Sequence, residues 1–190
     1  MNPLRLMSYF ALLLVLMPWR AQAADADDFV AATRSQQALL LEQWAVAPAA
    51  PRLPLLRALK SETLQSDSRG HAFSKQGDKL LALGAVAAPE GTIKPVRLTN
   101  RLRNLAAGAL ATHQLVSDNV TERASAAKIL QREATPEMAG LLQQRLTAET
   151  DGAVKSLLEI ALARLQLTSP QPAQRLAAIE RLGPSGDPET

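Results

Sequence analysis

RASAAKILQREATPE (residues 123–137) and RLAAIERLGPSGDPE (residues 175–189) share one pattern of residues at a spacing of 52 positions. In both copies an arginine is followed by apolar residues three, four and seven positions on, and by Pro-Glu at thirteen and fourteen. These apolar residues are Ala126, Ala127 and Leu130 in the first copy and Ala178, Ile179 and Leu182 in the second. The first three spacings fall on one face of a helix, and proline suits the first turn of the next. The pattern predicts a helix-turn-helix unit that occurs twice, as in an α-solenoid.

Helical spacing of apolar residues surrounds both copies. We predict helices over residues 99–115, 120–132, 136–146, 154–165 and 175–182. Ser117 or Asp118 is expected to cap the second of these, Asp151 to cap the fourth, and Gly183 to stop the last. The turns are short, so neighbouring helices should be antiparallel.

The 52-residue period is longer than that of ordinary HEAT repeats, so an extra helix should lie within it. We therefore predict an all-α fold, with an irregular HEAT-like α-solenoid over residues 99–190. The second copy ends at Thr190 where its next helix should begin, and we expect the chain to be the front part of a longer protein.

A pair of helices is predicted for residues 24–64. The first covers about residues 29–45 and follows Asp25, Asp27 and Asp28, which we interpret as capping groups rather than a cation site. The second covers about residues 53–64, where Pro54 fits only in the first turn.

Residues 65–98 break the helical period with glycines, serines and prolines. Residues 71–74 and 79–83 are candidates for a small β-hairpin, and residues 94–98 for a third strand. The alternative is an insertion without regular structure.

Residues 1–23 are typical of a secretory signal peptide. Arg5 precedes the apolar run of residues 6–17, and Ala21-Gln22-Ala23 is a small-residue cleavage site. The alternative, an uncleaved anchor, is disfavoured because a membrane-spanning helix needs about 20 apolar residues. Removal of Arg5 and Arg20 leaves 19 basic against 18 acidic residues, which argues against nucleic-acid binding.

No catalytic, cofactor-binding or metal-binding set is predicted. The chain has no cysteine, and its only histidines, His71 and His113, lie far apart without ligand spacing. Asn100, Arg101 and Arg103 are the one polar cluster that could contact a partner or a missing portion of the chain itself. The alternative for these three is a solvated first turn of a helix.

The ordered segments resemble the N-terminal extracytoplasmic region of the urea ABC transporter permease subunit, a family related to branched-chain amino-acid permeases. The matching stretches are DDFVAA (27–32), LLEQWA (40–45), RLPLLRAL (52–59), VRLTNRLRNL (96–105), ALARLQL (161–167) and RLAAIERLG with GDP (175–188).

This resemblance implies a region on the periplasmic side of the inner membrane that precedes a membrane domain. It implies three partners: the membrane permease portion, a periplasmic urea-binding protein and cytoplasmic ATPase subunits. A scaffold or contact role in urea import would follow, without a small-molecule site in this segment and without nucleic acid. The alternatives are a free-standing secreted HEAT-like adaptor and, by analogy with HEAT-like lyases, an enzyme.

Overall fold

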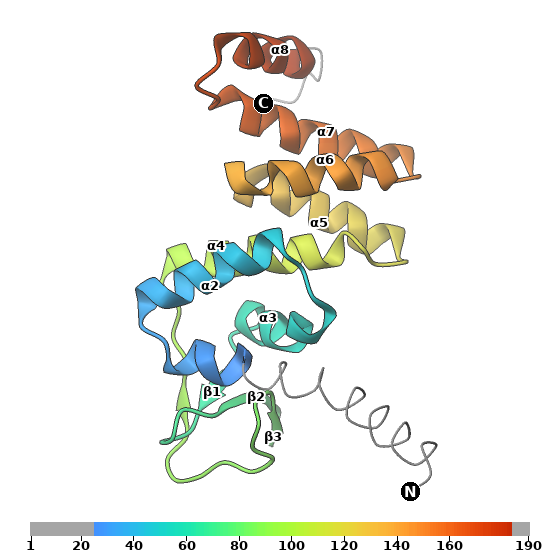
Figure 1. The fold of residues 1–190 in the computed structure, drawn as a ribbon. Coiled ribbons are helices and arrows are strands. Elements are labelled where there is room, and N and C mark those ends of the chain that lie inside the picture. The colour runs from blue at the N-terminus through green and yellow to red at the C-terminus, as the bar shows by residue number, and fades with distance from the viewer. Residues whose placement is uncertain (1–24, 184–190) are drawn as a thin grey trace, which may run out of the picture. The chain divides into compact units, whose positions relative to one another are not determined.

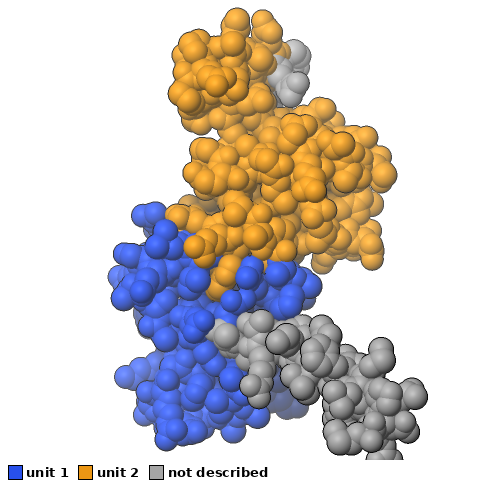
Figure 2. Space-filling model, viewed as in Figure 1, with its two compact units in different colours: residues 1–40, 49–102 blue, residues 41–48, 103–190 orange. Residues whose placement is uncertain are grey.

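The computed structural model describes residues 25–183, which are mostly helical with one small antiparallel sheet. The predicted helical class is therefore confirmed. The predicted signal peptide and the second Pro-Glu pair lie outside the described residues. The chain divides into two compact units, residues 1–40 with 49–102 and residues 41–48 with 103–190 (Figure 2).

Unit 1 begins with two helices where the sequence predicted one over residues 29–45. Residues 25–31 are helical, the helix breaks at residues 32–33, and α2 covers Arg34–Val46. The backbone N–H of Gln36 donates to the Thr33 hydroxyl at 3.4 Å, and the Gln36 side chain accepts from the Thr33 N–H at 2.9 Å. This reciprocal capping box starts a new helix at residue 34, so the prediction of a single helix is wrong.

The second predicted helix is present but shorter. The 3₁₀ turn η1 (Ala50–Arg52) leads into α3 (Leu53–Lys60), with Pro54 in the first turn as predicted. Its buried face comprises Leu55, Leu56, Ala58 and Leu59. The helix ends before residue 64 because the chain turns through Glu62, at a φ of 56°, into a strand.

The predicted hairpin is confirmed and belongs to a four-stranded sheet. The strands are β1 (Leu64–Ser66), β2 (Ala72–Gln76), β3 (Lys79–Ala82) and β4 (Lys94–Pro95), in the order β3-β2-β1-β4. All neighbours are antiparallel, and Gln76 pairs with Lys79 across a two-residue turn. Gly77 in that turn has a φ of 59°, a conformation that glycine adopts without strain. The alternative of an insertion without regular structure is thus wrong.

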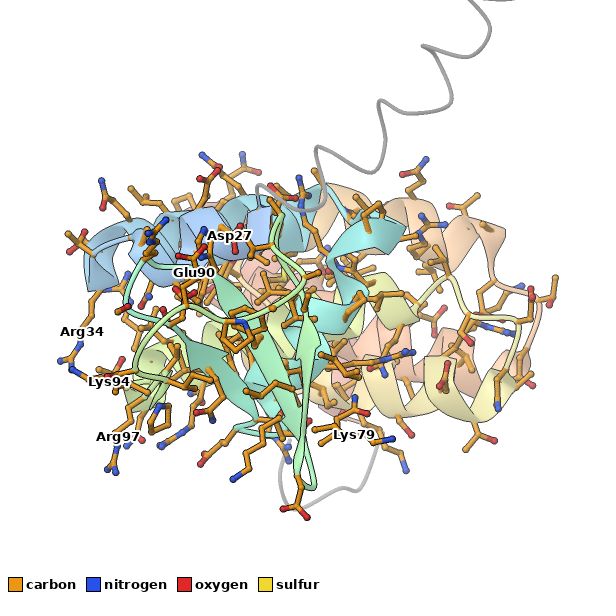
Figure 3. The ribbon with its side chains drawn as sticks, turned by 90° about the horizontal axis from the view of Figure 1, so that it is seen from below. Asp27, Arg34, Lys79, Glu90, Lys94 and Arg97 are labelled. Carbon is orange, nitrogen blue, oxygen red and sulfur yellow. The ribbon has the colours of Figure 1, made fainter. Side chains whose placement is uncertain are left out.

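Both edge strands carry features that discourage pairing with another chain. Lys79 on β3 and Lys94 on β4 are exposed (Figure 3), and Pro95 has no backbone N–H to offer. Charged residues and proline on edge strands oppose the addition of further strands. These residues therefore oppose extension of the sheet by a strand from another chain.

Asp27 ties the first helix to the sheet. Its Oδ1 accepts from the backbone N–H of Ala72 at 2.8 Å and its Oδ2 from that of Ala85 at 2.9 Å. Both carboxylate oxygens thus bond to the sheet region, which contradicts the prediction that Asp27 caps its own helix. Phe29 and Phe73, both fully buried, contribute to the core of this unit.

Unit 2 consists of consecutive helices (Figure 1). They are most of α4 (Asn100–Gln114), α5 (Val120–Glu133), the 3₁₀ turn η2 (Pro136–Met138), α6 (Ala139–Ala148), α7 (Gly152–Leu167) and α8 (Pro172–Leu182), and the end of α2 also belongs to this unit. Helix α7 packs against α5, α6 and α8. Three helices, α5 to α7, precede α8, so the extra helix predicted within the 52-residue period is present.

The helix caps agree with the prediction in part. Asp151 caps α7 as predicted, by accepting from the N–H groups of Ala153 and Val154. Asn119, and neither Ser117 nor Asp118, caps α5. Gly183 has a φ of −54°, so it does not end α8 in the left-handed conformation typical of glycine stops.

Within residues 25–183, no helix is both long enough and apolar enough to span a bilayer.

Candidate functional site

The predicted contact residues lie in the first turn of α4. Asn100, Arg101 and Arg103 are all exposed, and the turn begins where the hydroxyl of Thr99 accepts from the backbone N–H of Leu102 at 3.3 Å. Exposed polar groups at the start of a helix suit a contact surface and a solvated turn equally. The partner-contact role of these three residues stays a prediction.

Two arginines build the same turn twice in unit 2. Arg123 donates from Nη1 to the carbonyl oxygens of Ser117 at 2.9 Å and Asp118 at 3.1 Å. Arg175 donates from Nη1 to the carbonyl oxygens of Ser169 at 2.8 Å and Pro170 at 3.1 Å. Each pair of acceptors lies six and five residues before its arginine.

The remaining bonds of the two turns also match. Ser117 donates to the Glu122 carboxylate and Ser169 to the Gln174 side-chain carbonyl, both at 2.6 Å. The serine hydroxyl then accepts from the N–H two residues on, at 3.2 Å in the first turn and 3.1 Å in the second. The 52-residue sequence repeat is therefore also a repeat of local structure.

The first arginine has an additional partner that lies far along the chain. Arg123 donates from Nε to Glu149 Oε2 at 2.8 Å and from Nη2 to Oε1 at 2.9 Å. Glu149 lies in the turn between α6 and α7, and its Oε1 also accepts from the N–H groups of Thr150 and Asp151. The prediction that Glu149 caps a turn is correct but incomplete, since its principal partner is Arg123.

These contacts shift the pKa values of both partners. The bonds from Arg123 lower the pKa of Glu149 from 4.5 to about 2, against the opposing effect of burial, and the Thr150 and Asp151 N–H groups add to this. Glu149 in turn raises the pKa of the Arg123 guanidinium. The pair is charged at neutral pH and joins the start of α5 to the start of α7.

The helix faces that carry the repeated apolar positions differ between the copies. On α5, Ala126, Ala127 and Leu130 are fully buried. On α8, Ala178 and Leu182 are buried and pack with Ala163 of α7. Ile179 and its neighbour Leu176, however, are 58% and 59% exposed. One face of α8 is therefore covered and another is open.

An apolar groove of about 410 Å³ lies between α6, α7 and α8. Its lining residues are Pro136 of η2, Ala139 and Gln143 of α6, Leu162, Leu165 and Gln166 of α7, Thr168, Ser169 and Pro170 of the following turn, and Gln174 of α8. Because its walls are mostly apolar and small, the groove suits a protein side chain better than a charged metabolite.

A second cavity, of about 360 Å³, adjoins the Arg123–Glu149 pair. Its walls are mostly polar and include Arg145, whose Nε is buried without a hydrogen-bond partner. The carboxylate of Glu149 is already saturated by four donors. Within the part of the chain that the structure describes, this cavity therefore presents one buried guanidinium nitrogen without a hydrogen-bond partner.

Unit 1 has its own polar centre at Asp67, whose side chain is fully buried. Its oxygens accept from the N–H groups of Arg69, His71 and Glu90 and from the His71 ring, at 2.9 to 3.0 Å. Burial raises the pKa of Asp67, but the four bonds outweigh it and hold the pKa far below its usual range. The bond to Asp67 raises the pKa of His71 above 6.5.

This polar centre organises the loops around the sheet. Glu90, labelled with Asp27 in Figure 3, also forms an ion pair with Arg69 at 2.9 Å. Each donor that faces Asp67 comes from the turns before and after the hairpin. Among the described residues, no group of three histidine, aspartate or glutamate side chains could hold a metal ion.

Comparisons with known proteins give no relative: no family model, curated protein or solved structure matches this chain.

Proposed function

We propose that this chain is a non-catalytic helical-repeat domain of a urea ABC transporter permease subunit. In this proposal it lies on the periplasmic side of the inner membrane and acts in urea import as a scaffold or contact region. Membrane attachment would come from a further portion of the protein. The finer fold that we propose is an irregular HEAT-like α-solenoid over unit 2.

The observation that carries the repeat architecture is the turn built twice by Arg123 and Arg175. Equal bonds at a spacing of 52 residues mean that the sequence repeat specifies backbone geometry as well as apolar spacing. In a solenoid each unit packs on its neighbours along the chain. The packing of α7 on α5 and of α8 on α7 is consistent with this arrangement, because these helices are close together in sequence. Solenoids of this kind bind other proteins through extended surfaces.

The transporter assignment is supported by the order of the sequence segments that resemble the permease family. The segment VRLTNRLRNL (residues 96–105) leads from β4 into α4, and RLAAIERLG (residues 175–183) coincides with α8 and its end. Each of these two segments therefore coincides with the start or the length of one helix of the fold. The groove between α6, α7 and α8 is the surface we assign to contact with a partner subunit.

The decisive experiment removes this region in frame from its gene in the native host and measures the uptake of labelled urea at low concentration. We expect uptake to fall at least about tenfold, while uptake of a branched-chain amino acid through its own transporter stays unchanged. Normal urea uptake would refute the transporter assignment. Recovery of unrelated envelope proteins with the tagged chain would then favour the free-standing adaptor.

A second experiment tests the groove itself. Gln143 is exposed and lines the groove, whereas Gln144 is exposed beside it and does not. Gln143→Trp should fill the groove and reduce co-purification of the urea-binding protein with the tagged chain. Gln144→Trp is the matched control and should leave co-purification unchanged. Equal recovery with both variants would remove the groove from the proposal.

A further inference from the structure

The polar cavity of unit 2 contains an arginine that the fold leaves unsatisfied. The cavity lies where the turn between α4 and α5 approaches the turn between α6 and α7, both at the same end of their helices (Figure 1). Arg145, in the last turn of α6, lines it with a half-buried side chain whose Nε has no hydrogen-bond partner. Among residues 25–183, no carboxylate forms an ion pair with Arg145. Because a buried donor without an acceptor destabilises the folded chain, a ligand that supplies the acceptor is favoured here.

The other charged residues of the cavity do not satisfy Arg145. Glu149 accepts two bonds from Arg123 and two from backbone N–H groups. Arg123 uses all three of its nitrogens, for Glu149 and for two backbone carbonyls. Asp118 is exposed, and within the described part of the chain its carboxylate forms no ion pair with Arg145. The Arg123–Glu149 pair is therefore complete in itself, and Arg145 is the cation that remains for a ligand.

The position of Arg145 in α6 explains its charge but not its burial. Cations are favoured near the C-terminal end of a helix, where they offset the partial negative charge of the last carbonyls. A fully exposed guanidinium would have the same effect without burying Nε. Thr150, which is exposed and lines the same cavity, adds a hydroxyl group that can donate or accept. The cavity thus presents a cation and a hydroxyl group to whatever enters it.

The charge and size of the cavity define the class of ligand. Arg123 shows within this unit how a guanidinium binds a carboxylate, through two parallel bonds from Nε and Nη2. A volume of about 360 Å³ holds a small molecule. The negative charges of Asp118 and Glu149 disfavour a doubly charged anion such as phosphate relative to a singly charged one. The mostly polar walls favour a ligand with a hydroxyl group over one with a long hydrocarbon chain.

We propose that this cavity binds a small, singly charged hydroxycarboxylate. Its carboxylate accepts bonds from Nε and a terminal nitrogen of Arg145, and its hydroxyl group lies near Thr150 and Asp118. The inference does not depend on the transporter assignment. It departs from the family resemblance, which implied no small-molecule site in this segment.

The test is a titration of the purified full chain with glycolate, the smallest hydroxycarboxylate, followed by NMR at constant pH and ionic strength. The Arg145 Nε–H signal and the backbone amide signal of Thr150 report on the cavity directly. We expect both signals to shift saturably, with half-saturation at about 1 to 10 mM. Acetate, which lacks the hydroxyl group, and inorganic phosphate should each bind more weakly than glycolate.

Three variants separate this site from general electrostatic attraction, with the Thr150 amide as the signal. Arg145→Met keeps the apolar stem, and we expect glycolate binding to weaken at least about tenfold while stability in urea is unchanged or higher, because the lost nitrogen had no partner. Asp118→Asn removes a like charge and should strengthen binding about twofold to threefold. Arg132→Met is the matched control, since Arg132 is an exposed arginine of α5 outside the cavity, and it should not change binding.

Four outcomes would overturn the proposal. The first is a shift that does not saturate or that chloride produces equally. The second is equal affinity of Arg145→Met and the native chain, and the third is weaker binding by Asp118→Asn, a readout that stays available if Arg145→Met does not fold. The fourth is tighter binding of inorganic phosphate than of glycolate, which would assign the cavity to phosphate-bearing ligands instead.

Discussion

Arg123 and Glu149 form a two-point ion pair across 26 residues of sequence, with N–O distances of 2.8 and 2.9 Å. The side chains are 13% and 5% exposed, so the pair is largely withdrawn from water. Two parallel bonds between a guanidinium and a carboxylate set orientation as well as distance. Together with the bonds from Thr150 and Asp151, this pair holds α5 and the start of α7 in register.

Loss of the Glu149 charge should destabilise unit 2. Glu149→Gln keeps the size of the side chain but leaves Arg123 with one weaker acceptor in a poorly hydrated site. We expect the free energy of unfolding to fall by about 2 kcal/mol, measured by urea denaturation. Glu159→Gln on the exposed surface of α7 is the control and should change it by less than about 0.5 kcal/mol. Equal effects of the two substitutions would show that the pair contributes nothing specific.

Acid should weaken the same contact. The folded-state pKa of Glu149, about 2, lies below its ordinary value of 4.5, so the pair contributes stability above that ordinary value. This contribution is lost as the pH falls from about 4.5 toward 2, because folding then has to keep a proton off the carboxylate. Urea denaturation at pH 5 and pH 3 should therefore show a larger drop for the native chain than for Glu149→Gln. A drop of the same size in both would place the acid sensitivity elsewhere.

The pair formed by His71 and Asp67 should respond to pH in the opposite range. The pKa of His71 is raised above 6.5 in the folded state, so its contribution to stability is full below pH 6.5. It is lost as the pH rises through the folded-state pKa, because the neutral ring no longer attracts the Asp67 carboxylate. Titration of His71 by NMR should give a midpoint above 6.5 that Asp67→Asn lowers. A midpoint at or below 6.5 would contradict the contact.

Loss of one of the two carboxylate oxygens of Asp27 should weaken the contact between the first helix and the sheet region. Asp27→Asn turns one carboxylate oxygen into an N–H donor that would face the N–H of Ala72 or Ala85. We expect a loss of about 1 to 3 kcal/mol in the stability of unit 1 and faster hydrogen exchange at these two amides. Asp28→Asn, at the exposed neighbouring position, should leave exchange at both amides unchanged.

Gly84 gives an independent check of the same link. A side chain added at Gly84 would overlap the carboxylate of Asp27. Gly84→Ala should therefore displace Asp27 and accelerate exchange at Ala72 and Ala85 as Asp27→Asn does. Normal exchange in Gly84→Ala would show that Asp27 is not held in place there.

The start of α2 should depend on its capping box. Thr33→Ala removes the hydroxyl that accepts from the Gln36 N–H, and we expect a loss of about 1 kcal/mol. Ser35→Ala, two residues on inside the helix, is the matched control and should be neutral or slightly stabilising. Calorimetric melting of the two variants separates these outcomes, and equal melting temperatures would exclude the cap.

Local patterns predicted most of the helices but few of their long-range contacts. The spacing of Leu55, Leu56 and Leu59 was enough to place α3 and its buried face, and Asp151 was recognisable as a cap from its position before an apolar run. The break before α2 was missed although Thr33 and Gln36 have capping-box spacing. The apolar pattern of residues 29–45 continues across the break and concealed it.

The partners of the charged residues could not be predicted because they lie far apart in sequence. Asp27 bonds to residues 45 and 58 positions further on, and Glu149 to an arginine 26 positions before it. Spacing rules describe neighbours on one helix or one hairpin and say nothing of such pairs. Strand β1 was missed for a related reason: its three residues form a strand only because β2 and β4 lie on either side.

The reach of Asp27 also sets an order of events during synthesis. The helix at residues 25–31 receives its bond to Ala85 only after 58 more residues have been made, whereas the side-chain bonds of Arg123 and Gln131 in unit 2 each close a loop of 26 residues. Loops that are short in sequence close sooner and at lower entropic cost than long ones. The helix at residues 25–31 is synthesised before the sheet, so the Asp27 carboxylate lacks its bonds to Ala72 and Ala85 until the sheet has formed. A chaperone that binds nascent chains would bind this helix before those bonds exist.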